Sequence, residues 1–529
     1  MRNQGVLHGI ALLSVVALLA KILSAAYRIP FQNLSGDMGY YVYQQIYPFY
    51  GIVMVLAMYG FPVVLSKRRA ELLAAGFVNE ARNVTSLLFY GLLLITVFVW
   101  LALYILAPSI AELMADRQLE GPIRAMSFVV LLLPFLSVGR GYHQGEGELV
   151  STAVSHIVEQ LVRVLFILGF TYVFVTLGFD AYKIGAAAAY GSLIGGVIGI
   201  IALLFFTRAV WLRQLVHPKR LQLSKVLNEN IGMLKQSVFI CLSALIFVLL
   251  QLIDAFTIVR FLQWSGVAAS EAFPTKGIYD RGQPLLQLGT VLTTTLSLAL
   301  VPMLSKAVAK RDFTAAKHYQ TLSYRLTLLI GGAATIGLVI IIEPTNHMLF
   351  TDILGTNVLR VMSVAILFCS FFVTISAVLQ GYNLAFLPAI AVGIGVLLKL
   401  IFNVLLVPLL GTIGAAWSTV IAVIVMVGYL LLALKRNNYL FIGHYKSYIQ
   451  IVIVLILMGV VTWLWKKGLT TMLSIHNRGT DSVVALSSAA IGGIVVASCL
   501  FTLALFTEEE WNKIPKLNKL RVRLMKRRG

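Results

Sequence analysis

The chain has 529 residues, of which 59% are hydrophobic and 12% are charged, and its formal net charge is +21. Soluble globular proteins carry about 25% charged residues, so this composition excludes that class. Apolar stretches of about 20 residues, enough to cross about 30 Å of hydrocarbon, recur along the whole chain. We therefore predict an all-α, polytopic membrane protein with about fourteen transmembrane helices and no soluble domain. The predicted spans centre near residues 15, 53, 95, 130, 163, 195, 247, 293, 332, 368, 397, 423, 456 and 494.

The first apolar segment is interpreted as a retained helix, because it is longer than the apolar core of a secretory signal. Basic residues then gather in alternate connections, whereas the loop after the third span carries Glu112, Asp116 and Glu120. By the positive-inside rule, both termini are predicted to be cytoplasmic in a multi-pass protein of the cell membrane. The basic segments lie at residues 67–69, 208–235, 306–317, 435–436 and 513–528. A lipid-surface role suits the basic tail better than nucleic-acid binding, because it lacks interleaved aromatic residues.

An internal repeat relates two parts of the chain. The Gln-Gly pair at 144–145 recurs at 380–381, and the same offset places Arg163 on Lys399 without a gap. Each cation lies near the middle of an apolar span, where insertion costs about 2.5–3.5 kcal/mol. Such residues usually face a watery cavity or bind an anion. Their matching positions predict a central site between two similar lobes.

The repeat also predicts the architecture. Two lobes of about six helices share one orientation, and two further helices follow them. The predicted parts are an N-lobe (1–207), a basic cytoplasmic linker (208–235), a C-lobe (236–436), the last two helices (437–506) and a basic cytoplasmic tail (507–529). Parallel repeats with a site at their interface are typical of alternating-access transporters.

Two alternatives stay open for each central cation. Glu159 lies four residues before Arg163, so an intrahelical ion pair competes with substrate contact, and Gln160 extends the polar face. Lys399 has Asn403 one turn on but no acidic partner on its own helix. It either contacts the substrate or pairs with a carboxylate on another helix.

Three further polar positions are candidates. Arg28, near the outer end of the first span, either snorkels to the interface or serves the cavity. Asp254, with Gln251 one turn before it, is a candidate coupling-ion ligand or partner for a cavity cation. Arg281 precedes the eighth predicted span and is a fourth candidate cavity cation.

Catalytic and metal-binding motifs are absent from the sequence. The cysteines Cys241, Cys369 and Cys499 lie far apart in apolar segments, so they predict neither a metal site nor a disulfide. There is no Walker A loop, zinc-protease motif or nucleophile elbow. We predict a non-enzyme without a cofactor. Coupling to the membrane potential, to Na⁺ or to H⁺ stays open.

Several short motifs resemble a known family, the polysaccharide transporters. The resemblance is closest to the stage V sporulation protein B-like branch of the multidrug/oligosaccharidyl-lipid/polysaccharide exporter superfamily, which is related to MurJ-type lipid II flippases. These motifs lie at residues 26–30, 47–48, 60–62, 66–67, 140–142, 159–163 and 280–284, together with Gln287.

The resemblance implies a two-lobed bundle, of MATE and MurJ type, around a cationic cavity. It implies a monomeric flippase that moves a polyprenyl-pyrophosphate-linked glycan or peptidoglycan precursor, with membrane lipids and cell-envelope synthesis proteins as further partners. MurJ proteins also carry an arginine within helix 2, which is absent here, so the cavity charge would come from Arg28, Arg163, Lys399 and Arg281. The alternative is an ion-coupled exporter of small cationic amphiphiles, which predicts an anionic cavity instead.

Overall fold

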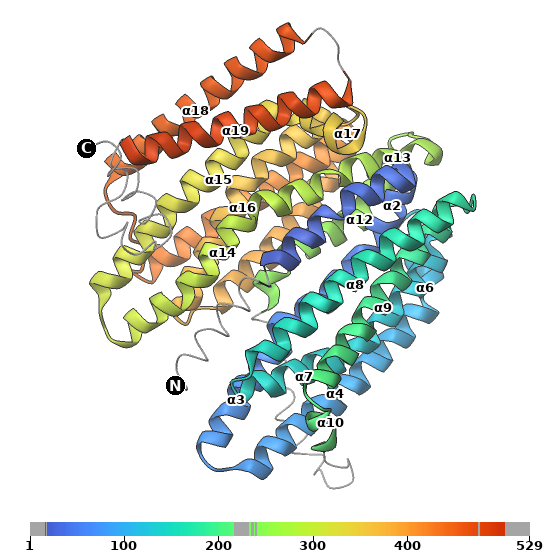
Figure 1. The fold of residues 1–529 in the computed structure, drawn as a ribbon, viewed down its shortest axis with the longest axis vertical. Helices are drawn as coiled ribbons and strands as arrows, with labels where there is room; N and C mark the ends of the chain where they lie inside the picture. Colours follow the sequence, from blue (N-terminus) through green and yellow to red (C-terminus); the bar gives the residue numbers. More distant parts are fainter. Residues whose placement is uncertain are drawn as a thin grey trace. The chain divides into compact units, whose positions relative to one another are not determined.

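A computed structural model describes residues 16, 18–215, 232–233, 237, 241–473 and 477–502. In these ranges the regular structure is helical, without strands (Figure 1). Twelve helical stretches of this part of the chain are long and apolar enough to cross a membrane. The predicted all-α polytopic fold is therefore confirmed. The predicted span centre at residue 15, most of the linker and the basic tail lie outside the described residues.

Two of these stretches are long enough for two crossings each. Leu18–Ala74 has 57 residues and Phe386–Arg436 has 51. Each is broken by a glycine in a left-handed conformation, Gly36 (φ +67°) in the first and Gly411 (φ +60°) in the second. A glycine tolerates this conformation because it has no Cβ. With one helix on either side of each break, the twelve stretches of the described residues are consistent with the fourteen predicted spans.

The chain forms two compact units. Unit 1 comprises Met1–Val291 and Ala385–Ala422, and unit 2 comprises Leu292–Leu384 and Val423–Gly529. These two units are defined by contacts within each of them, and they do not test the lobe boundaries predicted at residues 207, 236 and 436. Those boundaries stay a prediction.

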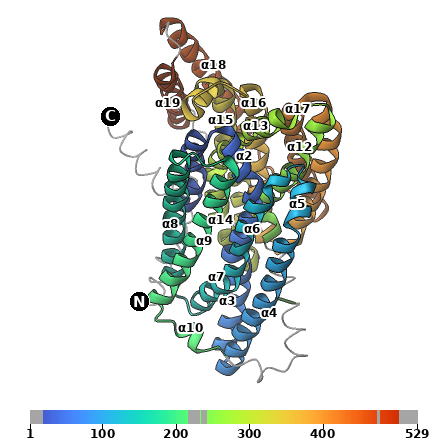
Figure 2. The same ribbon diagram turned by 90° about the vertical axis from the view of Figure 1, so that its right-hand side faces the viewer.

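Unit 1 contains most of the numbered helices, which Figure 2 shows from a second side. Helix α2 (Arg28–Val55) continues through a π-helical turn, Leu56–Gly60, into α3 (Phe61–Ala74). Short 3₁₀ turns at Arg117–Leu119 and Phe128–Leu132 flank α6 (Glu120–Ser127). The first part of α17 belongs to this unit, and α14 begins in it. The helices are α2 (Arg28–Val55), α3 (Phe61–Ala74), α4 (Val78–Ile105), α5 (Ala107–Leu113), α6 (Glu120–Ser127), α7 (Leu133–Gly145), α8 (Leu149–Thr176), α9 (Ala181–Phe206), α10 (Val210–Arg213), α12 (Ile246–Trp264), α13 (Ala269–Asp280), α14 (Gly282–Ala309) and α17 (Phe386–Arg436).

Unit 2 combines hydroxyl contacts with an apolar core. It holds most of α14, the end of α17, and α15 (Phe313–Phe350), α16 (Thr356–Gly381), α18 (Tyr445–Met472) and α19 (Arg478–Thr502). The Thr293 hydroxyl of α14 donates to the Ser370 hydroxyl of α16 at 3.0 Å. Buried apolar residues hold α15, α18 and α19 together, namely Leu322, Leu329, Ile451, Val454, Leu455 and Cys499.

Glycines let α8 and α9 pack closely along their length (Figure 1). A Cβ on Gly191 would lie 2.8 Å from the Ile167 nitrogen, and a Cβ on Gly195 would lie 2.6 Å from the Arg163 Cβ. A Cβ on Gly199 would lie 2.9 Å from the Glu159 Cβ. Small residues are the usual means of close helix packing in membranes. This glycine seam fixes the helix that carries Glu159 and Arg163.

We expect Gly195→Ala to lower the melting temperature of the purified protein, with overpacking costing about 1–3 kcal/mol. The added methyl group would collide with the backbone of α8 at Arg163. Gly169→Ala in α8 is the matched control, because nothing lies within 4 Å of its Cβ position. The control should gain up to about 1 kcal/mol from helix propensity. Equal melting temperatures of the two variants would contradict the role of the seam.

Candidate functional site

Arg28 is fully buried at the start of α2. Its guanidinium carbon lies 4.0 Å from the centre of the Tyr47 ring. None of its three guanidinium nitrogens has a hydrogen-bond partner among the described residues. A snorkelling arginine keeps its charged end in water, so that alternative for Arg28 is wrong.

Arg163 of α8 is equally buried and is stabilised by rings and a hydroxyl. Its guanidinium carbon lies 4.9 Å from the Tyr27 ring centre and 4.6 Å from that of Tyr50. Nη2 donates to the Ser24 hydroxyl at 3.0 Å, whereas Nε and Nη1 have no hydrogen-bond partner in the part of the chain that the structure describes. Gln160 accepts from Ser24 at 2.8 Å and donates to the Tyr50 hydroxyl at 3.4 Å. Arg163 therefore keeps both its charge and unused donors.

Glu159 pairs with a different arginine from the one that the sequence suggested. Its Oε2 lies 2.6 Å from Nη2 of Arg140 in α7, which also donates to Ser155 at 3.1 Å. His156 Nδ1 lies 3.9 Å from the same carboxylate. The predicted alternative of an intrahelical Glu159–Arg163 pair is wrong, because the Glu159 side chain of α8 points toward Arg140 of α7.

A row of tyrosines on α2 accompanies the two unpaired arginines. Tyr43, Tyr47 and Tyr50 recur at helical spacing, so they share one face, and all three are buried. The Tyr43 and Tyr27 hydroxyls are 2.8 Å apart. Sequence reasoning missed this row, although the spacing of four and then three residues was a readable signal. We call these side chains the arginine–tyrosine cluster: Arg28, Arg163, Tyr27, Tyr43, Tyr47 and Tyr50.

Lys399 of α17 has close partners on three sides. Its Nζ lies 2.7 Å from Asp254 Oδ1, 2.8 Å from the Ala415 carbonyl oxygen and 2.6 Å from the Thr419 hydroxyl. Asn403 donates to Asp254 Oδ1 at 3.0 Å. The structure thus shows the second predicted alternative for Lys399, pairing with a carboxylate on another helix.

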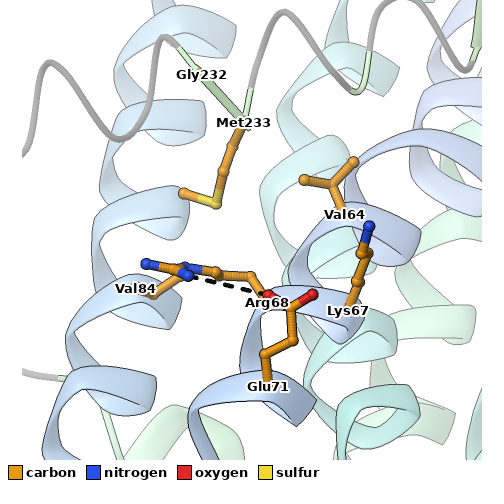
Figure 3. Close-up of a pocket in the computed structure, with 7 residues that line it drawn as sticks. All are labelled: Val64, Lys67, Arg68, Glu71, Val84, Gly232 and Met233. Atoms are coloured by element: carbon orange, nitrogen blue, oxygen red, sulfur yellow. Dashed lines mark ion pairs between the residues drawn. The ribbon is translucent and has the colours of Figure 1, made fainter.

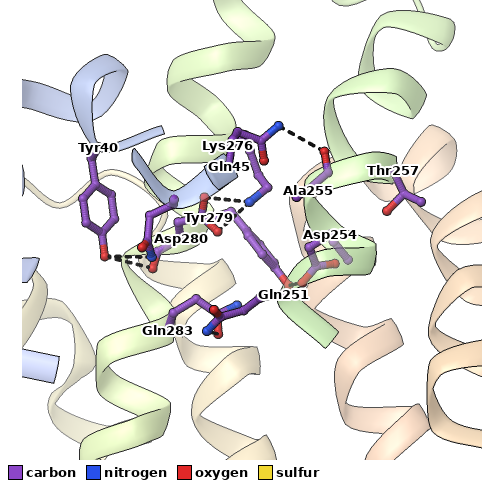
Figure 4. Close-up of polar contacts among 12 residues, drawn as sticks. Tyr40, Gln45, Gln251, Asp254, Ala255, Thr257, Lys276, Tyr279, Asp280 and Gln283 are labelled. Carbon is purple, nitrogen blue, oxygen red and sulfur yellow. Dashed lines mark hydrogen bonds and ion pairs between the residues drawn. The ribbon is translucent and has the colours of Figure 1, made fainter. Parts of the chain in front are cut away.

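Further polar contacts surround Asp254 and the start of α14 (Figure 4). The Tyr279 hydroxyl donates to Asp254 Oδ2 at 2.7 Å. Gln251 donates to Gln283 at 2.8 Å. Lys276 and Asp280 form a buried ion pair at 2.6 Å, which the sequence did not reveal.

Arg281 lies between α13 and α14 and pairs with Asp37. Its Nη2 lies 2.7 Å from each carboxylate oxygen of Asp37. All four predicted cavity cations therefore lie in unit 1. Arg281 and Lys399 have acidic partners, whereas Arg28 and Arg163 form no ion pair in the described part of the chain.

Two pockets lie elsewhere. Figure 3 shows one of about 370 Å³ in unit 1, where Arg68 and Glu71 are 3.9 Å apart. The other, of about 510 Å³, lies in unit 2, where His347 Nδ1 and Asp481 Oδ2 are 2.6 Å apart. No predicted site residue lines either pocket, and no metal-binding group of three His, Cys, Asp or Glu side chains occurs among the described residues. The first pocket is lined by Val64, Lys67, Arg68, Glu71, Val84, Gly232 and Met233.

Replacing Arg140 by methionine should destabilise the protein by about 3–5 kcal/mol, because Glu159 would become a buried charge without a partner. Adding Glu159→Gln should recover part of this loss. Thermal unfolding of the purified variants measures both effects. Arg117→Met is the control, since its pair with Glu112 is exposed and should change stability little. A double variant less stable than Arg140→Met alone would contradict the pairing.

Relatives by sequence cover the whole chain. Residues 6–308 match the family described as "Polysaccharide biosynthesis protein". The chain is 38% identical to "Uncharacterized membrane protein YabM" of Bacillus subtilis (strain 168), over 100% of this chain and 98% of that protein. It is 25% identical to "Lipid II flippase MurJ" of the same organism, covering 97% of this chain and 98% of MurJ. It is 26% identical to "Stage V sporulation protein B" of the same organism, over 99% of this chain and 100% of that protein.

Solved structures share the fold. A structure of lipid II flippase MurJ in an inward closed conformation covers 93% of this chain and 99% of MurJ, with a TM-score of 0.68 and 15% identity. The match to an inward-facing multidrug resistance MATE family transporter of the MOP superfamily covers 81% of this chain and 98% of the transporter, with a TM-score of 0.64 and 17% identity. The chain is a multi-pass membrane transporter of the MurJ and stage V sporulation protein B type. By the match over residues 6–308, it belongs to the polysaccharide biosynthesis protein family.

Proposed function

We propose that the protein is a flippase that moves a polyprenyl-phosphate- or pyrophosphate-linked oligosaccharide or peptidoglycan precursor across the cell membrane by alternating access. The observation that carries this proposal is the burial of Arg28 and Arg163, neither of which pairs with a carboxylate among the residues that the structure describes. The names of the relatives support it, since MurJ is a lipid II flippase and the family is one of polysaccharide biosynthesis.

Unused guanidinium donors suit a phosphate ligand. The Arg28 guanidinium has five N–H groups, and none of its three nitrogens has a hydrogen-bond partner within the described ranges. A buried donor left unsatisfied costs about 1–3 kcal/mol, and more when it is charged. Phosphate oxygens offset this cost because they accept bidentate bonds from a guanidinium. The charge of the cluster thus favours an anionic head group.

The tyrosine rings stabilise the two cations without neutralising them. A cation over an aromatic face gains about 0.5–2 kcal/mol, yet its full charge remains. A carboxylate at the same place would cancel the charge and repel phosphate. Both guanidiniums are enclosed in the structure, so in the proposed cycle the substrate reaches them when the surrounding helices part.

The buried carboxylates argue against the alternative, a multidrug-type exporter of cations. Glu159 pairs with Arg140, Asp254 with Lys399, and Asp280 with Lys276. Asp116, outside the spans, instead accepts hydrogen bonds from Tyr41 and Tyr182, and burial raises its pKa. These three carboxylates are already neutralised by basic side chains of the protein, so they are not available to bind a cationic drug.

We further propose that both termini are cytoplasmic and that the transport unit is a monomer without a cofactor. Membrane lipids and cell-envelope synthesis proteins are its proposed partners. The inside-negative membrane potential would favour outward movement of an anionic head group by about 2.3 kcal/mol per charge per 100 mV.

Translocation in cells depleted of every other flippase tests the proposed function. We expect the wild type to restore precursor translocation, and Arg28→Gln and Arg163→Gln to lower it at least about tenfold at equal membrane abundance, which corresponds to about 1.4 kcal/mol each. Arg260→Gln is the matched control, because this arginine is exposed and donates to backbone carbonyls. Failure of the wild type to restore any lipid-linked glycan would overturn the proposal, and full activity of both cluster variants would overturn the role of the cluster.

Reporter fusions test the proposed orientation. A fluorescent protein fused after residue 529 should fluoresce, because it would fold in the cytoplasm. Alkaline phosphatase fused at residue 115, in the acidic connection just after α5, should be active because it would lie outside. The opposite pattern of activities would reverse the orientation.

A further inference from the structure

We propose that the Lys399 ammonium occupies a cation-binding site built from protein oxygens, so that the chain carries a tethered cation where a metal ion could otherwise bind. Lys399 then holds helices together and does not contact the transported anion. This inference is independent of the proposed function, because it concerns the occupant of a closed site in unit 1.

Three oxygens surround the Lys399 nitrogen at 2.6–2.8 Å. They are a carboxylate oxygen of Asp254, the backbone carbonyl oxygen of Ala415 and the hydroxyl oxygen of Thr419. An ammonium group has three N–H donors, so the three oxygens satisfy it completely. Carboxylate, carbonyl and hydroxyl oxygens are also the ligands that hard metal cations take. The site therefore has the composition of a cation cage.

A second layer of polar groups fixes these oxygens. Tyr279 donates to Asp254 Oδ2 at 2.7 Å, and Asn403 donates to Oδ1 at 3.0 Å. Asn403 also donates to Thr257 at 2.7 Å and accepts from the Ser418 hydroxyl. These side chains are buried. Outer-layer bonds of this kind orient the ligands of metal sites.

The backbone of α17 brings the parts of the site together. Lys399 lies before the break at Gly411, whereas Ala415 and Thr419 follow it. A Cβ on Gly414 would lie 2.2 Å from the Leu406 carbonyl oxygen, so the chain on either side of the break packs backbone to backbone. The Lys399 side chain crosses this junction and also reaches α12 through Asp254. One ammonium thus joins three helical segments.

Satisfaction of donors separates Lys399 from Arg28. The side-chain polar atoms of Lys399 and Asp254 all have hydrogen-bond partners, whereas the three guanidinium nitrogens of Arg28 have none among the residues described. A phosphate could bind Lys399 only by displacing Asp254 and leaving that carboxylate buried without a partner, which is costly. We therefore assign Lys399, which the repeat predicted as a substrate contact, to linking helices instead.

Thermal unfolding of the full-length protein in detergent tests this site without any transported substrate. The probes are NaCl, LiCl and KCl, each compared with choline chloride at the same ionic strength. We expect the wild type to melt at one temperature in all four salts. Lys399→Ala empties the site while keeping the oxygens, so an alkali cation should raise its melting temperature by roughly 2–5 °C over choline.

Two variants are matched controls. Lys399→Met removes the charge but fills the space with an apolar chain, so the salt-specific rise should be absent. Combining Lys399→Ala with Asp254→Asn removes the charged ligand, and the rise should again disappear. If Lys399→Ala yields no folded protein in choline, recovery in an alkali salt alone supports the site, and Lys399→Ser repeats the measurement with an added oxygen.

Several results would overturn the tethered-cation site. One is a wild-type protein that alkali salts stabilise and that loses this response in Asp254→Asn. Another is a folded Lys399→Ala variant with the same melting temperature in all four salts. Failure to obtain folded Lys399→Ala or Lys399→Ser protein in any of the salts also counts against the site, because an external cation would then not replace the ammonium. None of these outcomes bears on translocation, so they are separate from failure of the flippase proposal.

Discussion

The high cost of a charge inside a membrane governs the polar architecture of unit 1. A buried ion without compensation costs several kcal/mol even after relaxation, so each cation needs a partner among the packed helices. Arg140 and Glu159 meet this requirement across α7 and α8, and Lys399 and Asp254 meet it across α17 and α12. Against this background, Arg28 stands out because its guanidinium lies over the ring of Tyr47 and pairs with no carboxylate in the described ranges.

The two repeats stabilise their buried cations in different ways. Arg163 and Lys399 occupy matching places in the sequence. Arg163 lies among tyrosine rings and keeps free donors, whereas Lys399 is enclosed by oxygens and keeps none. Cations at matching places in the two repeats therefore have different surroundings, aromatic rings and a hydroxyl for Arg163 and three oxygens for Lys399.

The sequence was a good guide to burial and a poor one to pairing. Apolar length and charge placement are local properties, so the spans and the mid-membrane position of Arg163 were predictable. Asp254 was also named as a candidate partner for a cavity cation. Of the two alternatives for Arg163, the intrahelical pair with Glu159 is wrong, because spacing along one helix says nothing about the rotation of α7 against α8. Asp37, which pairs with Arg281, was missed for the same reason, since 244 residues separate the two.

The glycine seam between α8 and α9 has a mechanical consequence. Helices whose backbones are in contact cannot slide without collision, so this pair moves as one rigid body. Deformation within the N-terminal part of unit 1 must then be taken up elsewhere. The continuous stretch Leu18–Ala74 offers two such points, the left-handed Gly36 and the π-helical turn Leu56–Gly60. Tyr47 and Tyr50, whose rings lie against Arg28 and Arg163, are between these two points, so a bend at either point would carry these two rings away from the guanidiniums.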